Sequence, residues 1–249
     1  VNLWWQSLQE QARSQGREPT QEEMEKVAGM AIDSALAVVC DQRIFQQAVR
    51  VLGDKKKCQV EVIDGPRGTK LRLVTVKLSD DDGQAGSRIV SAAIACHRAD
   101  VILWRNYPGD VHVATNVKSG FRTARTEEDG AWCDLDNLAC CLRVEEQRVR
   151  GVEEPFTDWK AMRQEGRVFE DDVWYYDRRY GAIHNGTRSY PDISPTAISF
   201  DNIRRMLIMA MMDYGFEPSR AARMCRQDQC EGTGCPRYRY GLRCCRGVR

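Results

Sequence analysis

The stretch CQVEVIDGPRGTKLRLVTVKL, residues 58–78, decides the fold class of this chain. Two segments rich in β-branched residues surround DGPRG (64–68), which predicts a β-hairpin with a five-residue turn region. Apolar residues occupy positions 71 and 73, and then 74, 76 and 78. This change of phase predicts either a bulge or a strand that is buried on both faces. A second hairpin is predicted where residues 101–104 and 111–113 flank NYPGD (106–110).

Helical patterns lie on both sides of these hairpins. The clearest begins at Thr20, which forms a capping-box pattern with Glu23, and ends at Gly53. The polar residues 41–43 leave open whether this region is one helix or two. Further helices are predicted before Gly16 and over 133–151, 155–166 and 199–215, with a strand over 167–176. Helices, strands and again helices predict an α+β fold whose central antiparallel sheet contains two hairpins and a further strand.

Composition places the chain among folded proteins and excludes few functions. Of 249 residues, 42% are hydrophobic and 29% are charged, and the formal net charge is +1. No apolar run is long enough to span a bilayer, and the first residues do not resemble a signal peptide. The 11 cysteines are scattered, which favours a reduced intracellular protein in the cytoplasm or nucleus. The sequon at Asn185 leaves a secreted, disulfide-bonded protein as an alternative.

The last 33 residues differ from the rest, so we divide the chain into a body (1–216) and a basic, cysteine-rich C-terminal module (217–249). The module has eight arginines, no lysine and three acidic residues, a local charge of +5. Arginine binds phosphates in a bidentate manner, and tyrosines between arginines supply stacking faces for unpaired bases. The module therefore predicts binding of RNA, single-stranded DNA or another anionic partner; the alternative is a solvated tail that pairs with an acidic protein surface. The predicted nucleic-acid-binding residues are Arg220, Arg223, Arg226, Arg237, Tyr238, Arg239, Tyr240, Arg243 and Arg246.

The cysteines of the module are candidate zinc ligands. Zinc prefers four thiolate or imidazole ligands in tetrahedral geometry, and nearby glycines permit the tight bends that surround such an ion. The spacing lacks the Cys-x2-Cys pairs of typical zinc sites, so free thiols and disulfides stay as alternatives. The candidate ligands are Cys225, Cys230, Cys235, Cys244 and Cys245.

Two histidines suggest an enzymatic alternative. His112 lies on a predicted strand and His184 in DRRYGAIHNGTRSYPDISPT (177–196), a predicted loop of about 20 residues. With a cation such as Arg179, two histidines can cleave a phosphodiester by paired general acid and base catalysis. This hypothesis requires both side chains to approach one shared cleft. A surface histidine and a loop histidine without a catalytic role are the simpler interpretation.

The segment RRMLIMAMM (204–212) is apolar nearly all round, so its helix is either part of the core or a homo-oligomer interface. No common catalytic motif is present. The sequence therefore predicts a structural or regulatory nucleic-acid-binding protein, of a type found among viral and regulatory factors, with its C-terminal module ordered by zinc. The alternatives are a phosphodiester-cleaving enzyme and a secreted protein.

Overall fold

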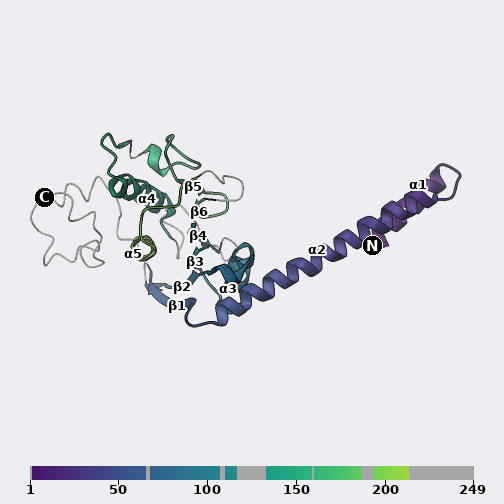
Figure 1. Ribbon diagram of the computed structural model, residues 1–249, viewed down its shortest axis with the longest axis horizontal. Helices are drawn as coiled ribbons and strands as arrows, with labels where there is room; N and C mark the ends of the chain where they lie inside the picture. The colour runs from purple at the N-terminus through teal and green to yellow at the C-terminus, as the bar shows by residue number, and fades with distance from the viewer. Residues whose placement is uncertain are drawn as a thin grey trace, which may run out of the picture.

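The computed structural model describes residues 2–65, 68–106, 110–116, 133–158, 160–186 and 193–212. Within these residues, a body built on a six-stranded sheet carries a long helical arm that extends away from it (Figure 1). The class is α+β, as predicted. The C-terminal module, with all of its predicted arginine, tyrosine and cysteine site residues, lies outside the described residues.

The sheet has the strand order β1-β2-β3-β4-β6-β5. Its strands are β1 (Cys58–Asp64), β2 (Lys70–Lys77), β3 (Val101–Arg105), β4 (Val111–Thr115), β5 (Trp174–Asp177) and β6 (Ala182–Asn185). Both predicted hairpins are present, as β1–β2 and β3–β4. The pair β2–β3, however, is parallel, so the sheet is mixed. The reason is that residues 89–97 form a helix, α3 (Ile89–His97), and a connection with a helix is long enough for a crossover.

Strand β2 is buried on both faces, which settles the change of phase in its sequence. Leu71 and Leu73 belong to one core, whereas Val74 and Val76 belong to the other. The register with β1 is continuous from residue 58 opposite 76 to residue 64 opposite 70, so there is no bulge.

Helices cover both faces of the sheet. Helices α4 (Leu135–Arg150) and α5 (Phe200–Met211) pack on one face around the larger core. On the other face lie α3 and the C-terminal end of α2 (Gln21–Gly53), where Ala48, Val51 and Leu52 are buried. Helix α2 is continuous through residues 41–43, and its capping box at Thr20 and Glu23 is present. Helix α1 (Asn2–Ser14) packs against α2.

Three sequence predictions for the second half of the body were wrong in part. The helix predicted over 155–166 is only a 3-10 turn at Ala161–Arg163, and the strand predicted over 167–176 is limited to β5. The loop predicted over 177–196 contains β6, so His184 lies on a strand. The glycines and prolines around His184 predicted a loop and gave no signal of this strand of four residues. Strand β6 is held by pairing with β4 on one side and with β5 on the other.

The methionine-rich helix is part of the core. Met206, Met209 and Met211 are each at most 2% exposed, so α5 has no apolar face left for a partner in the described structure. The sequon asparagine is also enclosed, because Asn185 is 0% exposed and its amide donates to the carbonyl of Val173. No helix within the described ranges is long and apolar enough to cross a membrane.

Candidate functional site

A row of aromatic side chains crosses three neighbouring strands of the sheet. Trp104 on β3 lies directly opposite His112 on β4, and His112 lies opposite His184 on β6. All three point to the sheet face that α2 and α3 cover elsewhere. The Trp104 and His112 rings are stacked with centroids 4.9 Å apart, while His184 meets His112 edge-on at 5.2 Å. Strand pairing thus brings together two histidines that are 72 residues apart in the sequence.

The two histidines are hydrogen-bonded to each other through Nδ1, at 3.1 Å. His112 Nε2 lies 2.9 Å from the amide nitrogen of Asn106, which donates to it. Since His112 Nε2 is then an acceptor, its Nδ1 carries the proton and donates to His184 Nδ1. The remaining nitrogen of His184, Nε2, bears a hydrogen and has no partner among the described residues. The chain Asn106–His112–His184 therefore ends in one N–H donor.

Burial keeps both imidazoles neutral. His112 is only 6% exposed, and this burial, followed by the neighbouring His184, lowers the pKa of His112 to about 3. Burial also lowers the pKa of His184, against a smaller opposing effect from Asp177. At neutral pH the pair is uncharged and its hydrogen bond holds one transferable proton. Nε2 of His184 is a base in the other neutral tautomer of the pair, in which His184 Nδ1 bears the hydrogen and donates to His112 Nδ1 while the hydrogen of His112 lies on Nε2.

The histidine pair forms one wall of a pocket of about 550 Å³, which is the size of a small-ligand site. The opposite wall comes from the segment between β2 and α3. Its side chains in the pocket include Ser79, Asp80, Gln84 and Ser87. Asp110 completes the polar lining, and burial raises the pKa of its carboxyl group. Among the described residues that line the pocket there is no arginine or lysine.

The wall is held close to the sheet by a partly buried ion pair and by close packing at a glycine. Asp82 is 6% exposed and binds Lys57 Nζ at 2.7 Å. At Gly86, a Cβ atom would lie 2.4 Å from Oδ1 of Asn106, so a larger residue here would displace the amide that orients His112. The packing around Gly86 therefore determines the position of the hydrogen-bonded chain.

Of the residues proposed for the enzymatic alternative, the structure brings together two. His112 and His184 share the pocket, whereas Arg179 is exposed, lies with its guanidinium 5.6 Å over the Tyr180 ring, and is not part of the lining. Trp104, Asn106 and Asp110 were missed by the sequence analysis. The only signal for them was their place in or beside the turn of a predicted hairpin, which does not distinguish a site from an ordinary turn.

No metal centre is found in the described part of the chain, where no group of three or more histidine, cysteine or acidic residues is placed to hold an ion. The proposed zinc ligands all belong to the C-terminal module. Among the described cysteines, Cys40, Cys58, Cys96 and Cys133 are free thiols.

The chain matches no protein-family model, and neither a curated protein nor a solved structure is significantly similar to it.

Proposed function

We propose that the pocket around His112 and His184 is the active site of an enzyme that cleaves phosphodiesters by general acid–base catalysis. The observation that carries this proposal is the 3.1 Å hydrogen bond between two neutral histidines inside one pocket. Nε2 of His184 is the group that meets substrate. In the tautomer in which His184 Nδ1 donates to His112 Nδ1, Nε2 accepts the proton of the attacking hydroxyl group or water, and the protonated ring then gives this proton to the leaving oxygen. His112 and Asn106 position the His184 ring.

The charge of the pocket sets a condition on the substrate. Asp80 and Asp110 line it without a described cation, so a phosphodiester anion needs neutralising charge from elsewhere. The C-terminal module, with its local charge of +5, is the proposed source of that charge. A polymeric nucleic acid that binds both regions is therefore the proposed substrate.

The acid–base proposal is tested by phosphodiesterase assays on the full chain, with bis(4-nitrophenyl) phosphate and with labelled RNA and single-stranded DNA, each with and without Mg²⁺. We expect His184→Ala to reduce the rate by about 10² to 10⁴-fold, the usual contribution of general acid–base catalysis. The rate should persist below pH 6.5, because the pKa of His184 is lowered. His97→Gln is the matched control, since His97 binds the carbonyl of Leu52 outside the pocket. An inactive wild-type protein, or an active His184→Ala protein, contradicts the proposal.

A second function is proposed for the C-terminal module, namely binding of RNA or single-stranded DNA with zinc ordering the module. The support for this function is a difference in net charge between two parts of one chain. The module carries +5, and since the whole chain carries +1, the other 216 residues carry −4. Phosphate contacts from arginines give strongly salt-dependent affinity. If the chain binds but does not cleave, the protein is the structural or regulatory factor that the sequence predicts.

Replacement of Arg237, Arg239 and Arg243 with alanine should weaken binding and reduce the slope of log K against log salt by about 2 to 3, close to one per lost phosphate contact. The matched control removes three exposed cations from the body (Lys55, Lys56 and Arg179). Elemental analysis of the same preparation should find about one zinc per chain, lost on replacement of Cys230 and Cys235 with serine. Equal salt slopes for both triple variants rule out the binding proposal, and a metal-free folded protein rules out zinc.

A further inference from the structure

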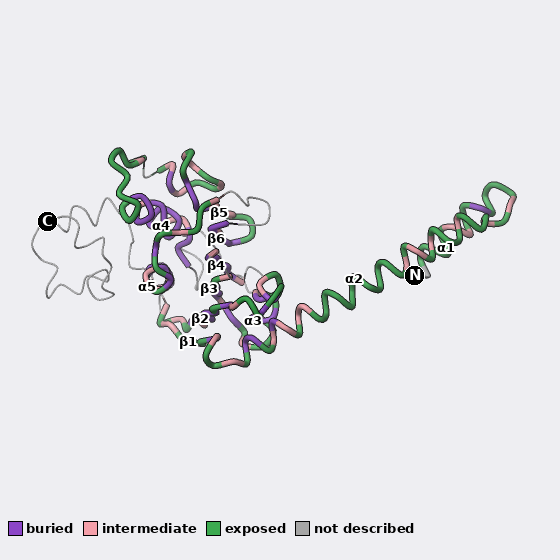
Figure 2. The backbone as a smooth tube through the Cα atoms, in the orientation of Figure 1, coloured by how far each residue is buried: buried purple, intermediate pink, exposed green. Residues whose placement is uncertain are grey.

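The helical arm, which consists of α1 and residues 21–43 of α2, has an unusual share of exposed apolar surface. Among the described residues, fourteen large apolar side chains are exposed, and nine of them lie between Leu3 and Val39. Figure 2 shows the arm as exposed or half-buried along most of its length, in contrast to the body. Apolar surface that is concentrated in this way on a soluble domain marks an interaction site.

Five of the exposed apolar residues of α2 form a continuous stripe on one side of the helix, whereas Met30, Ala37 and Val38 are exposed on other sides. The members of the stripe are spaced by 4, 3, 1 and 3 residues, which places them within about 100° of one another around the helix axis. All are exposed. They are Ala28, Ile32, Ala35, Leu36 and Val39. Helix α1 packs along the neighbouring side of α2, where Val27 and Ala31 are half-buried, so it does not cover this arm stripe.

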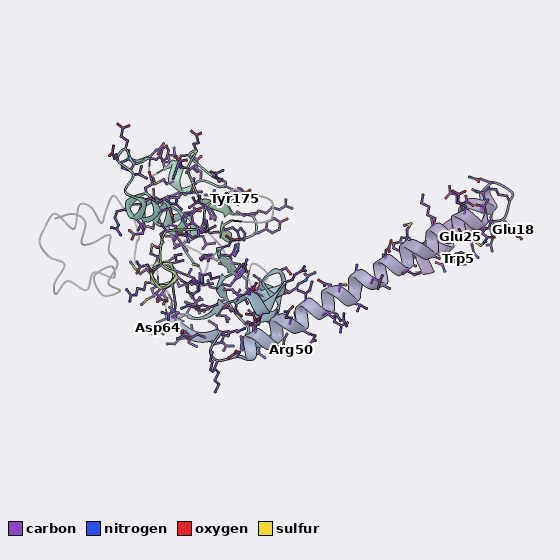
Figure 3. The ribbon with its side chains drawn as sticks, in the orientation of Figure 1. Trp5, Glu18, Glu25, Arg50, Asp64 and Tyr175 are labelled. Atoms are coloured by element: carbon purple, nitrogen blue, oxygen red, sulfur yellow. The ribbon has the colours of Figure 1, made fainter. Side chains whose placement is uncertain are left out.

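Opposite charges flank the two ends of the arm stripe. Glu25 precedes it and Arg43 follows it, and their separation of 18 residues equals five helical turns, so both lie on the same side of α2. Arg43 is exposed and has no hydrogen bond or ion pair with a described residue. Figure 3 shows Glu25 near Trp5 in the outer part of the arm, far from Arg50, where α2 reaches the body.

We propose that the arm stripe binds the arm stripe of a second copy of this chain, with the two α2 helices antiparallel. A two-fold axis near residue 34 places Ile32 of each copy opposite Leu36 of the other. The same register places Glu25 opposite Arg43, and symmetry repeats both contacts. A parallel pair in register would instead set Glu25 against Glu25 and Arg43 against Arg43. The spacing of apolar and charged residues is therefore self-complementary in the antiparallel orientation alone.

The geometry of the arm fits this partner. Residues 21–43 span about 35 Å at 1.5 Å per residue, and the helix extends away from the body, so a second helix can lie along it (Figure 1). A helix of this kind is stabilised mainly by covering its apolar face. Pairing at the arm leaves the histidine pocket uncovered, so the inference stands independently of the proposed function.

The test is the mass of the full chain in solution, measured by light scattering and sedimentation over a range of concentrations with a reductant present. We expect a dimer. Leu36→Asp should raise the dissociation constant at least about 100-fold, because it buries a charge at the centre of the pair. Glu25→Arg and Arg43→Glu should each raise it about tenfold, and the double variant should return it close to the wild-type value. Lys26→Glu, on the opposite side of α2, is the matched control and should leave the mass unchanged.

The mass measurements and the variants also distinguish a second copy of the chain from other occupants of the arm stripe. A monomeric wild-type protein, with the stripe covered by another segment of the same chain, overturns the proposal. So does a dimer that Leu36→Asp does not affect. In a parallel pair each charge swap would leave like charges opposite each other, so single variants with a dissociation constant close to the wild-type value overturn the antiparallel arrangement. Circular dichroism of each variant checks that α2 is still helical, and Ile32→Asp gives a second measurement if Leu36→Asp fails to fold.

Discussion

At the scale of the residue, His112 shows how position in the sheet determines chemistry. An exposed histidine has a pKa near 6.5 and titrates close to neutral pH. His112 is instead enclosed between Trp104 and His184, and its pKa falls to about 3. Burial is the main reason why His112 is neutral. Because neither ring is charged, the Nδ1–Nδ1 hydrogen bond forms without charge repulsion.

This burial predicts a loss of stability in acid. Between about pH 3 and 6.5 the unfolded chain binds a proton at His112 that the folded chain does not, so the free energy of unfolding falls as pH decreases. By pH 4 the loss from this residue should be about 3 kcal/mol. Urea unfolding between pH 7 and pH 4 measures it. His112→Phe, which keeps an aromatic ring beside Trp104, should show a shallower pH dependence by that amount, whereas equal pH profiles would exclude the effect.

At the scale of the element, helix α4 organises a segment that has little regular structure of its own. Arg143 is 0% exposed, and its guanidinium binds Asp172 at 2.8 Å. It also donates to the carbonyl groups of Met162, Gln164 and Gly166, which follow α4 in the chain, and to that of Trp174 at the start of β5. One side chain thus binds four backbone carbonyl groups between residues 162 and 174.

We therefore expect Arg143→Met to destabilise the protein by about 3–5 kcal/mol, because it leaves Asp172 buried without its partner. The double variant Arg143→Met, Asp172→Leu should recover part of this loss. Chemical denaturation of the full chain gives both values. Arg88→Met is the matched control, since its ion pair with Asp41 is exposed on both sides and should contribute less than about 1 kcal/mol. A loss of similar size in the two single variants would show that Arg143 has no organising role.

At the scale of the whole molecule, the candidate pocket and the arm both arise from the helical layer formed by α2 and α3. This layer covers β2 and β3 but leaves part of β4 and β6 to the segment 79–90, and the pocket lies in between. In the other direction, α2 continues beyond the sheet as the arm. The first feature provides a site for a ligand, and the second provides a surface for a second copy.

Much of the architecture could be predicted from local sequence. The hairpins, the capping box at Thr20 and the helix that ends at Gly151 depend on turn residues, caps and periodicity within short windows. The sequence also supports the contrast between the body and the basic module, whose function stays a proposal. The parallel pair β2–β3 and the short strand β6 were missed, because each is stabilised by neighbours that are distant in sequence.

By itself, then, the sequence determined the fold class, the strands of both hairpins and the ends of the main helices, since these depend on interactions between residues close together in the chain. Only the tertiary structure decided that His112 and His184 meet, that Arg143 pairs with Asp172 in the interior, and that the methionine-rich helix is buried while the α2 arm is exposed. Strand register and burial involve residues from separate elements. The physical reason is that a single β-pair, β4 with β6, converts two isolated histidines into one hydrogen-bonded site.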